Sequence, residues 1–239
     1  MKLNSFGCSF IFGTDLHDNN QSTLKLAGIP SNFTWPALLA KKRAWNYACF
    51  ARPGSGNLQI LDQLLNQLVD VDPAVYVVAW TWVDRFDYVK VMDQSDTPWP
   101  IRLPPGQKYN SADVNRLWKT IVPVDTSDIA ETYFKTLHNE YRDKLTTLIH
   151  VKTAIDVLKT SGNQFIMTYM DDLMFDTRWN TSPAMSALQQ YCKPYMTQFN
   201  GKNFLDFSRE KGFKISTALH PLEPAHESAA ELIDSYNLV

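Results

Sequence analysis

The sequence has few cysteines and little net charge, and it lacks any long apolar run. Three cysteines in 239 residues, Cys8, Cys49 and Cys192, are too few and too scattered for a disulfide framework or a zinc site. We therefore expect that the protein resides in a reducing compartment. No window approaches the roughly 20 apolar residues of a membrane span, and the start, MKLNSFGCSFIFG, lacks the pattern of a signal peptide. We expect a cytoplasmic protein with no membrane segment.

The charge balance also excludes a strong field for polyanions. The chain carries 23 basic and 25 acidic side chains, for a net charge of -2, so charge predicts no nucleic-acid partner. A hydrophobic content of 44% is typical of a globular protein. At roughly 100 to 200 residues per domain, the length favours a single domain spanning 1–239 over two small domains.

Apolar runs and helical periodicity predict an α/β fold. The clearest strand is 74–80, AVYVVAW, a continuous apolar run typical of a strand covered on both faces. Further strands are predicted at 3–6, 44–48 and 164–170. Helices are predicted at 34–41, from Asn57 to a stop at Asp72-Pro73, at 129–159, at 183–199 and from Pro224 to the end. Strands separated by helices indicate a parallel sheet between helical layers.

The segment 85–128 has no regular pattern. Five prolines interrupt it, and tryptophan and tyrosine side chains are scattered through it. Long irregular connections in a compact domain are commonly functional loops. We interpret 85–128 as an insertion or lid that follows the central strand.

Residues that follow the predicted strands are candidate site residues, because ligands of open parallel sheets bind outside the carboxyl ends of the strands. The first such segment, GCSF at 7–10, could present the Oγ atom and backbone N–H of Ser9 to a ligand. The alternative is a simple turn capped by Ser9.

The second segment, RPGSGN at 52–57, precedes a predicted helix. Free N–H groups at a helix N-terminus suit an oxyanion or a phosphate. The segment lacks the third glycine of a dinucleotide fingerprint and the Gly-Lys-Ser/Thr of a P-loop. A tight turn with Ser55 or Asn57 as the helix N-cap is the alternative.

The third segment, LHPLEPAHE at 219–227, precedes the last helix. A histidine bracketed by prolines is restrained yet exposed, which suits His220 to act as a general base. A purely structural histidine is the alternative. A metal site of His220, His226 and Glu227 is disfavoured by the spacing, so we predict no metal.

Taken in order, the motifs Gly-x-Ser-Phe-x-x-Gly, Gly-Ser-Gly-Asn and His-Pro resemble those of the SGNH (GDSL-like) hydrolase superfamily over the whole chain. The resemblance implies a three-layer, flavodoxin-like sandwich around a central parallel sheet. It implies that Ser9 is the nucleophile, with its own N–H in the oxyanion hole, that the Gly54 N–H is a second donor, and that His220 is the base. It implies no cofactor.

The sequence departs from the family pattern in three places. Cys8 stands where the first block usually has Asp, and no Asn follows the central strand, so Asn57 or Thr81 would have to donate to the oxyanion. Thr217 occupies the place of the Asp that normally orients the histidine. The candidates to orient His220 in its stead are a backbone carbonyl, Asp171, Asp172 and Glu223.

Three side chains near the end of the central strand are candidates for substrate binding. The rings of Trp80 and Trp82 could bind a sugar or an acyl chain, and Arg85 could hold an anion. Burial in the core explains Trp80 equally well.

Two functions follow from this reading. The leading one is a serine esterase or deacylase that cleaves or transfers an acyl group from a small or carbohydrate-borne ester through an acyl-serine. The alternative is a catalytically impaired protein of the same fold that serves as a carbohydrate- or protein-binding module. The sequence makes no prediction of oligomeric state.

Overall fold

The computed structural model describes residues 1–19, 29–68, 73–89, 118–178 and 182–237. Its centre is a four-stranded parallel sheet in the order β2-β1-β3-β6. The strands are β1 (Lys2–Phe6), β2 (Asn46–Cys49), β3 (Ala74–Trp80) and β6 (Gln164–Tyr169). The α/β fold with a central parallel sheet is confirmed, and every residue of β3 is buried, as its apolar run predicts.

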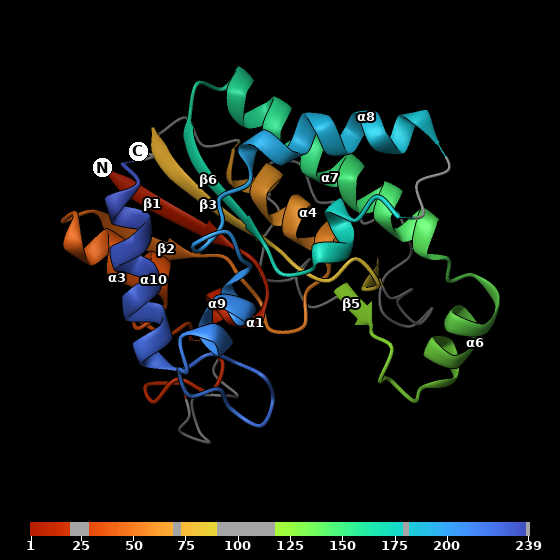
Figure 1. The fold of residues 1–239 in the computed structure, drawn as a ribbon, viewed down its shortest axis with the longest axis horizontal. Helices are drawn as coiled ribbons and strands as arrows, with labels where there is room; N and C mark the ends of the chain where they lie inside the picture. Colours follow the sequence, from red (N-terminus) through yellow and green to blue (C-terminus); the bar gives the residue numbers. More distant parts are fainter. Residues whose placement is uncertain (20–28, 69–72, 90–117, 179–181, 238–239) are drawn as a thin grey trace, which may run out of the picture.

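Helices cover both faces of this sheet (Figure 1). One face packs against α1 (Ser9–Phe12), α3 (Trp35–Lys42), α9 (Phe204–Glu210) and α10 (Glu223–Ser235). The other face packs against α4 (Asn57–Gln67), α7 (Glu140–Thr160) and α8 (Pro183–Cys192). Two separate hydrophobic cores result, one on each side of the sheet. None of the described helices is long and apolar enough to cross a membrane.

The single helix predicted over 129–159 is wrong, because the chain forms two helices there. α6 (Asp128–Thr136) ends at Thr136, with Leu137 as its C-cap, and α7 begins after Asn139. The Asn139 side chain accepts a hydrogen bond from the Arg142 N–H at 3.3 Å, which is N-cap geometry. The apolar stripe runs across both helices, so periodicity alone did not reveal the break.

Two other predicted boundaries also shift. The helix predicted over 183–199 ends at Cys192 and continues only as a 3₁₀ turn, η2 (Lys193–Tyr195), because Pro194 lies two residues beyond its last residue. Strand β2 begins two residues later than predicted, since Ala44 has a positive φ of 54°.

The described ends of the predicted insertion are regular. β4 (Phe86–Val89) and β5 (Trp118–Ile121) pair as a two-stranded antiparallel sheet. A third, small core forms where Ile121, Ala130 and Tyr133 pack together with Phe86. The rest of the segment, 90–117, lies outside the described residues, so its role as a lid stays a prediction, as does the single domain over 1–239.

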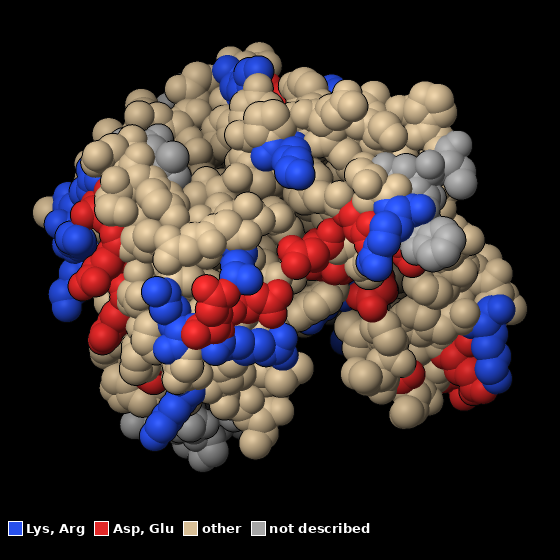
Figure 2. All heavy atoms as spheres, in the orientation of Figure 1, with Lys and Arg blue, Asp and Glu red and all other residues tan. Residues whose placement is uncertain are grey.

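Charged side chains of both signs intermingle on the surface. On the face shown in Figure 2, Lys and Arg lie beside Asp and Glu, and no extended patch of one sign is visible. Ion pairs such as Lys42 with Asp234, at 2.9 Å, account for part of this mixing. This face therefore offers no broad basic surface of the kind that polyanions require.

Candidate active site

Ser9 lies immediately beyond the carboxyl end of β1, as the first residue of α1. The turn between them is tight, because a Cβ atom on Gly7 would lie 2.7 Å from Ile11 Cγ1. Cys8 precedes Ser9 and is buried in the core, only 1% exposed. Ser9 itself is 6% exposed, so its Oγ atom is held in a restricted position at the edge of the sheet.

His220 reaches Ser9 from the other end of the chain. Its Nε2 atom lies 2.9 Å from Ser9 Oγ, which is hydrogen-bond distance. The residue lies in the loop before α10, and the preceding Leu219 has a positive φ of 65°. The His220 ring packs edge-on against Phe10, with ring centroids 5.4 Å apart. The two predicted residues are therefore brought together by tertiary structure.

Asp15 completes the arrangement. Its Oδ2 atom lies 2.8 Å from His220 Nδ1 and accepts a second hydrogen bond from Ser216 Oγ at 2.8 Å. Ser216 Oγ in turn accepts the backbone N–H of His220 at 3.1 Å. The result is a serine, a histidine and a carboxylate in series, with Ser216 bracing both the carboxylate and the histidine backbone.

The sequence analysis did not single out Asp15. Its backbone has a positive φ of 72°, a conformation uncommon for residues other than glycine and more often seen at functional positions. The sequence held one indication of such a role for Asp15, its position six residues after Ser9 in the same region beyond β1. A carboxylate so close to the nucleophile in sequence could have been tested as the orienting group.

The carboxylates proposed to orient His220 have other roles in the structure. Asp171 accepts the N–H groups of Val83 and Leu173, each at 3.0 Å, and so caps the 3₁₀ helix η1 (Asp172–Phe175). Burial raises the pKa of the Asp171 carboxyl. Asp172 is exposed. Glu223 accepts the His17 N–H at 2.6 Å, so Asp15 is the group that contacts His220 Nδ1.

The Asn57 side chain is bound within the protein. Its Oδ1 atom accepts the Thr81 N–H at 2.8 Å, and its Nδ2 atom donates to the Thr81 carbonyl at 3.3 Å and to Thr147 Oγ1 at 3.2 Å. Asn57 therefore fixes the chain just after β3. In this arrangement its amide is committed to those contacts, and we do not retain it as an oxyanion donor.

Gly54 lies in an exposed turn with a φ of +83°, and a Cβ atom there would meet nothing within 4 Å. Ser9 N–H belongs to the first turn of α1, where N–H groups have no partner within the helix. The Thr81 hydroxyl is buried and has no hydrogen-bond partner among the described residues. Of the predicted oxyanion donors, Ser9 has its backbone N–H at the start of α1, and the donor role of Gly54 stays a prediction.

The helix N-terminus predicted to attract a phosphate or oxyanion is already occupied by a carboxylate. Asp87, on β4, accepts the N–H groups of Gly56 and Gln59 at 2.9 Å each, and the hydroxyl of Thr120 at 2.6 Å. Burial raises the pKa of this carboxyl. The Asp87 side chain thus serves as the anion at the start of α4.

The two tryptophans near the end of β3 have different environments. Trp80 is fully buried, 0% exposed, so it is a core residue and cannot contact a substrate in this structure. Trp82 is half-buried and packs against Phe10, with ring centroids 5.7 Å apart. Arg85 lies over the Trp82 ring at 4.8 Å and donates to the Ser55 carbonyl at 2.9 Å.

His226 does not join His220 in a metal site. It is 1% exposed, and its Nδ1 atom accepts the Trp35 N–H at 3.1 Å, which ties α10 to α3. Burial lowers the pKa of His226 to about 3, so the ring is neutral. Within the described ranges, no group of three or more His, Cys, Asp or Glu side chains is arranged to hold a metal ion.

No protein-family model and no curated protein sequence matches the chain. Solved structures do match it over nearly its whole length. TesA is 12% identical over 100% of both chains, with a TM-score of 0.51. A lipolytic protein of the G-D-S-L family from Veillonella parvula is 12% identical over 98% of this chain and 97% of its own, with a TM-score of 0.48.

The psychrotrophic esterase EstA from Pseudoalteromonas is 10% identical, over 98% of this chain and 94% of its own, with a TM-score of 0.44. At such low identity a likeness shows the fold alone, and only the match to TesA exceeds a TM-score of 0.5 among these three. The parallel sheet, the helical layers on both faces and this match agree with the resemblance seen in the sequence motifs. The chain has the fold of the SGNH (GDSL-like) hydrolases.

Proposed function

We propose that the protein is a serine esterase or deacylase that cleaves an acyl group from a small or carbohydrate-borne ester through an acyl-serine intermediate. The observation that carries this proposal is the hydrogen-bonded series from Ser9 through His220 to Asp15, with steps of 2.9 and 2.8 Å. A nucleophile, a base and an orienting carboxylate in this order recur in hydrolases of unrelated folds.

Each group in the series has a definite task. His220 Nε2 takes the proton of Ser9 as the Oγ atom attacks the ester carbonyl, and a tetrahedral oxyanion forms. The imidazolium then gives that proton to the departing alcohol, which leaves Ser9 acylated. Asp15 keeps the Nδ1 proton of His220 in place and stabilises the imidazolium charge. A water, or the hydroxyl of an acceptor, releases the acyl group by the same steps in reverse.

We propose the backbone N–H groups of Ser9 and Gly54 as donors to the oxyanion. Backbone donors are suited to this task because they are fixed before the reaction and need no reorganisation when charge develops. The Asn57 amide is held by Thr81 and Thr147, so the usual side-chain donor has no replacement there. Loss of one such donor typically lowers the rate about 100- to 1000-fold, so a slow enzyme is expected.

That missing donor is also the observation that favours the alternative function. A protein that retains the fold but lacks a complete oxyanion hole could use the same edge to bind a carbohydrate or another protein without catalysis. The bracing of Asp15 and His220 by Ser216 argues for the enzyme, since a binding surface has no need of an ordered serine, histidine and carboxylate.

Covalent labelling with a fluorophosphonate probe tests the proposal, because the probe reacts with activated serines. Intact mass should show one adduct on the wild type, none on Ser9→Ala and much slower labelling of His220→Ala. Ser235→Ala, at an exposed serine on α10, is the matched control and should label like the wild type. No adduct on a wild-type protein that is folded by circular dichroism would favour the binding module.

A further inference from the structure

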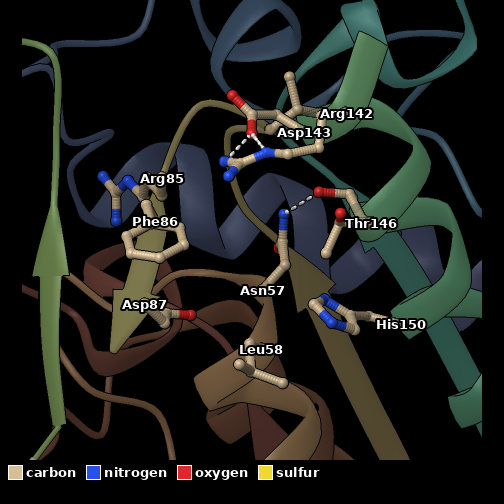
Figure 3. Close-up of a pocket in the computed structure, with 11 residues that line it drawn as sticks. Asn57, Leu58, Arg85, Phe86, Asp87, Arg142, Asp143, Thr146 and His150 are labelled. Carbon is tan, nitrogen blue, oxygen red and sulfur yellow. Dashed lines mark hydrogen bonds and ion pairs between the residues drawn. The ribbon is translucent and has the colours of Figure 1, made fainter. Parts of the chain in front are cut away.

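A cavity lies between α4 and α7, with Arg85 and His150 in its wall (Figure 3). Its volume is about 120 Å³, and Ser9, Asp15 and His220 are not among the described residues that line it. The helices α4 and α7 cover one face of the sheet, whereas α1 and α10 cover the other. Support for the candidate active site comes instead from the two loops next to α1 and α10.

His220 lies in a short hairpin that precedes α10. Ile215 and Pro221 form an antiparallel bridge across this hairpin, and the Ser216 N–H donates to the His220 carbonyl at 2.8 Å. Glu223, the first residue of α10, follows the hairpin directly. These backbone contacts hold His220 and the start of α10 together as one local unit.

Asp15 lies in a turn that is anchored by a core side chain. Leu16 is 0% exposed, and a Cβ atom on Gly13 would lie 3.0 Å from its Cδ1 atom. On either side of Leu16, Asp15 is half-buried and His17 is exposed. The φ of Asp15 is +72°, a conformation that costs energy and persists only where the surroundings fix it. The direction of the Asp15 carboxylate therefore depends on contacts from neighbouring segments.

Two carboxylates join this turn to the hairpin. Asp15 Oδ2 lies 2.8 Å from both Ser216 Oγ and His220 Nδ1. Glu223 Oε1 accepts the His17 N–H at 2.6 Å and lies 3.4 Å from His17 Nδ1. The turn is thus held at positions 15 and 17 by residues that flank His220 in the sequence.

We propose that Glu223 is a positioning residue, which holds the turn of Asp15 against the His220 hairpin through the His17 N–H. The inference rests on the proposed esterase function, since it concerns the same series from Ser9 to Asp15. Contacts behind the reacting groups matter because catalysis requires their geometry to be held within about 0.5 Å. A carboxylate in the first turn of a helix is also favoured by the helix dipole, which suits Glu223 to this end of α10.

Two substitutions of Glu223 separate positioning from helix stability. Glu223→Ala removes the acceptor, whereas Glu223→Gln keeps a carbonyl oxygen for the His17 N–H and removes only the charge. With a 4-nitrophenyl ester, Glu223→Ala should lower kcat about 10- to 100-fold with little change in KM, as expected for a small displacement of reacting groups. Glu223→Gln should recover most of that loss.

Both variants lose the favourable charge at the start of α10, so a role in helix stability alone would give them equal activities. Equal kcat values in Glu223→Ala and Glu223→Gln would therefore overturn the inference. Glu231→Ala, at an exposed position on α10, is the matched control and should keep the wild-type kcat. If Glu223→Ala does not fold, Glu223→Asp replaces it, because it keeps the charge but is one methylene shorter. Its kcat should then lie below that of Glu223→Gln.

A double-mutant cycle tests whether Glu223 acts through Asp15. If Glu223 only positions Asp15, Glu223→Ala should lower kcat little further once Asp15→Asn has removed the carboxylate. The same fold-change in both backgrounds would mean that Glu223 supports turnover independently of Asp15, contrary to the inference. Thermal unfolding of each variant shows whether it is folded at the assay temperature.

A measurement without substrate separates this inference from the proposed function. The proton between His220 Nδ1 and Asp15 should give a low-field NMR resonance, assigned by its loss in His220→Ala. It should be lost or broadened in Glu223→Ala and retained in Glu223→Gln. If no ester is hydrolysed but this pattern is seen, the positioning role stands and the esterase proposal fails. A resonance unchanged in Glu223→Ala, or absent from the wild type, would rule out the positioning role.

Discussion

Asp15 Oδ2 lies 2.8 Å from His220 Nδ1, although the two residues are 205 positions apart in the sequence. Asp15 follows the same strand and short helix that present Ser9, and His220 comes from the loop before α10. The proposed nucleophile and carboxylate are thus parts of one local structure, and the histidine is held between them. Any movement of the loop at His220 would break both contacts at once.

Replacement of Asp15 by asparagine should reduce turnover strongly. An amide at this position can hold His220 in the wrong tautomer and cannot stabilise the imidazolium charge. In the Ser-His-Asp triad of serine proteases the same change lowers kcat by about 10⁴-fold. We expect a loss on the order of 10³- to 10⁴-fold in kcat for Asp15→Asn, measured with a 4-nitrophenyl ester.

The matched control for Asp15 is Asp125→Asn, which changes an exposed carboxylate in the loop before α6. It should keep wild-type kcat. Thermal unfolding of both variants shows whether they fold. A folded Asp15→Asn protein with a kcat within a factor of ten of the wild type would remove Asp15 from the mechanism and return the role to another group.

Substitution of Gly56 should act through Asp87. A Cβ atom on Gly56 would lie 2.5 Å from Asp87 Oδ2, too close for both groups to stay in place. Gly56→Ala should therefore lower the free energy of unfolding by about 1–3 kcal/mol, the range for disturbing a buried hydrogen-bonded carboxylate. In an Asp87→Ala background the cost of Gly56→Ala should be smaller, because the obstructing carboxylate is gone.

A double-mutant cycle measured by urea denaturation quantifies this coupling between Gly56 and Asp87. Gly54→Ala is the comparison, because a Cβ atom there meets nothing within 4 Å and its cost comes from the positive φ alone. Gly54→Ala and Asp87→Ala should therefore be additive. Additivity of Gly56→Ala with Asp87→Ala would contradict the contact.

His226 should make the fold sensitive to acid. Its ring is neutral in the folded protein down to about pH 3, whereas an ordinary histidine takes up a proton near pH 6.5. Between these values the unfolded chain binds more protons, so falling pH lowers the free energy of unfolding by up to about 1.4 kcal/mol per pH unit. Below about pH 3 this contribution is constant.

Replacement of His226 by glutamine should flatten that dependence. Urea denaturation at several pH values between 6.5 and 4 should give a smaller decline of stability for His226→Gln than for the wild type. His150, whose pKa is lowered to about 4, acts in the same direction and should leave part of the decline in the variant. Identical pH dependences of the two proteins would show that His226 does not titrate in this way.

Patterns within short stretches of the chain were sufficient for the sheet and for two of the site residues. The apolar run of β3 predicts a buried central strand, because each of its side chains must leave water on one face or the other. Ser9 could be placed at the site edge because it follows a parallel strand, whereas the pairing of His220 with Ser9 was implied by the family resemblance of the motifs. Local spacing and the direction of the strands are enough for such predictions.

The hydrogen-bond partners of a side chain that lie far away in sequence could be identified only from the tertiary structure. Asn57 and Asp87 are suitable ligand-binding groups by residue type, yet backbone N–H groups of other segments occupy them. Trp80 and Trp82 are two residues apart in sequence, yet Trp80 is fully buried in the core and Trp82 is half-buried against Phe10.

The sequence by itself determined the α/β architecture, because this depends on periodicity and on the order of strands and helices, and the resemblance of its motifs pointed to Ser9 and His220 as partners. The tertiary structure alone decided that Asp15 contacts His220 Nδ1 and that Arg85 borders a cavity with His150. Hydrogen bonds and ion pairs require contact within about 3–4 Å. Which groups come that close depends on how the loops pack together in space, and residue type and spacing do not specify this packing.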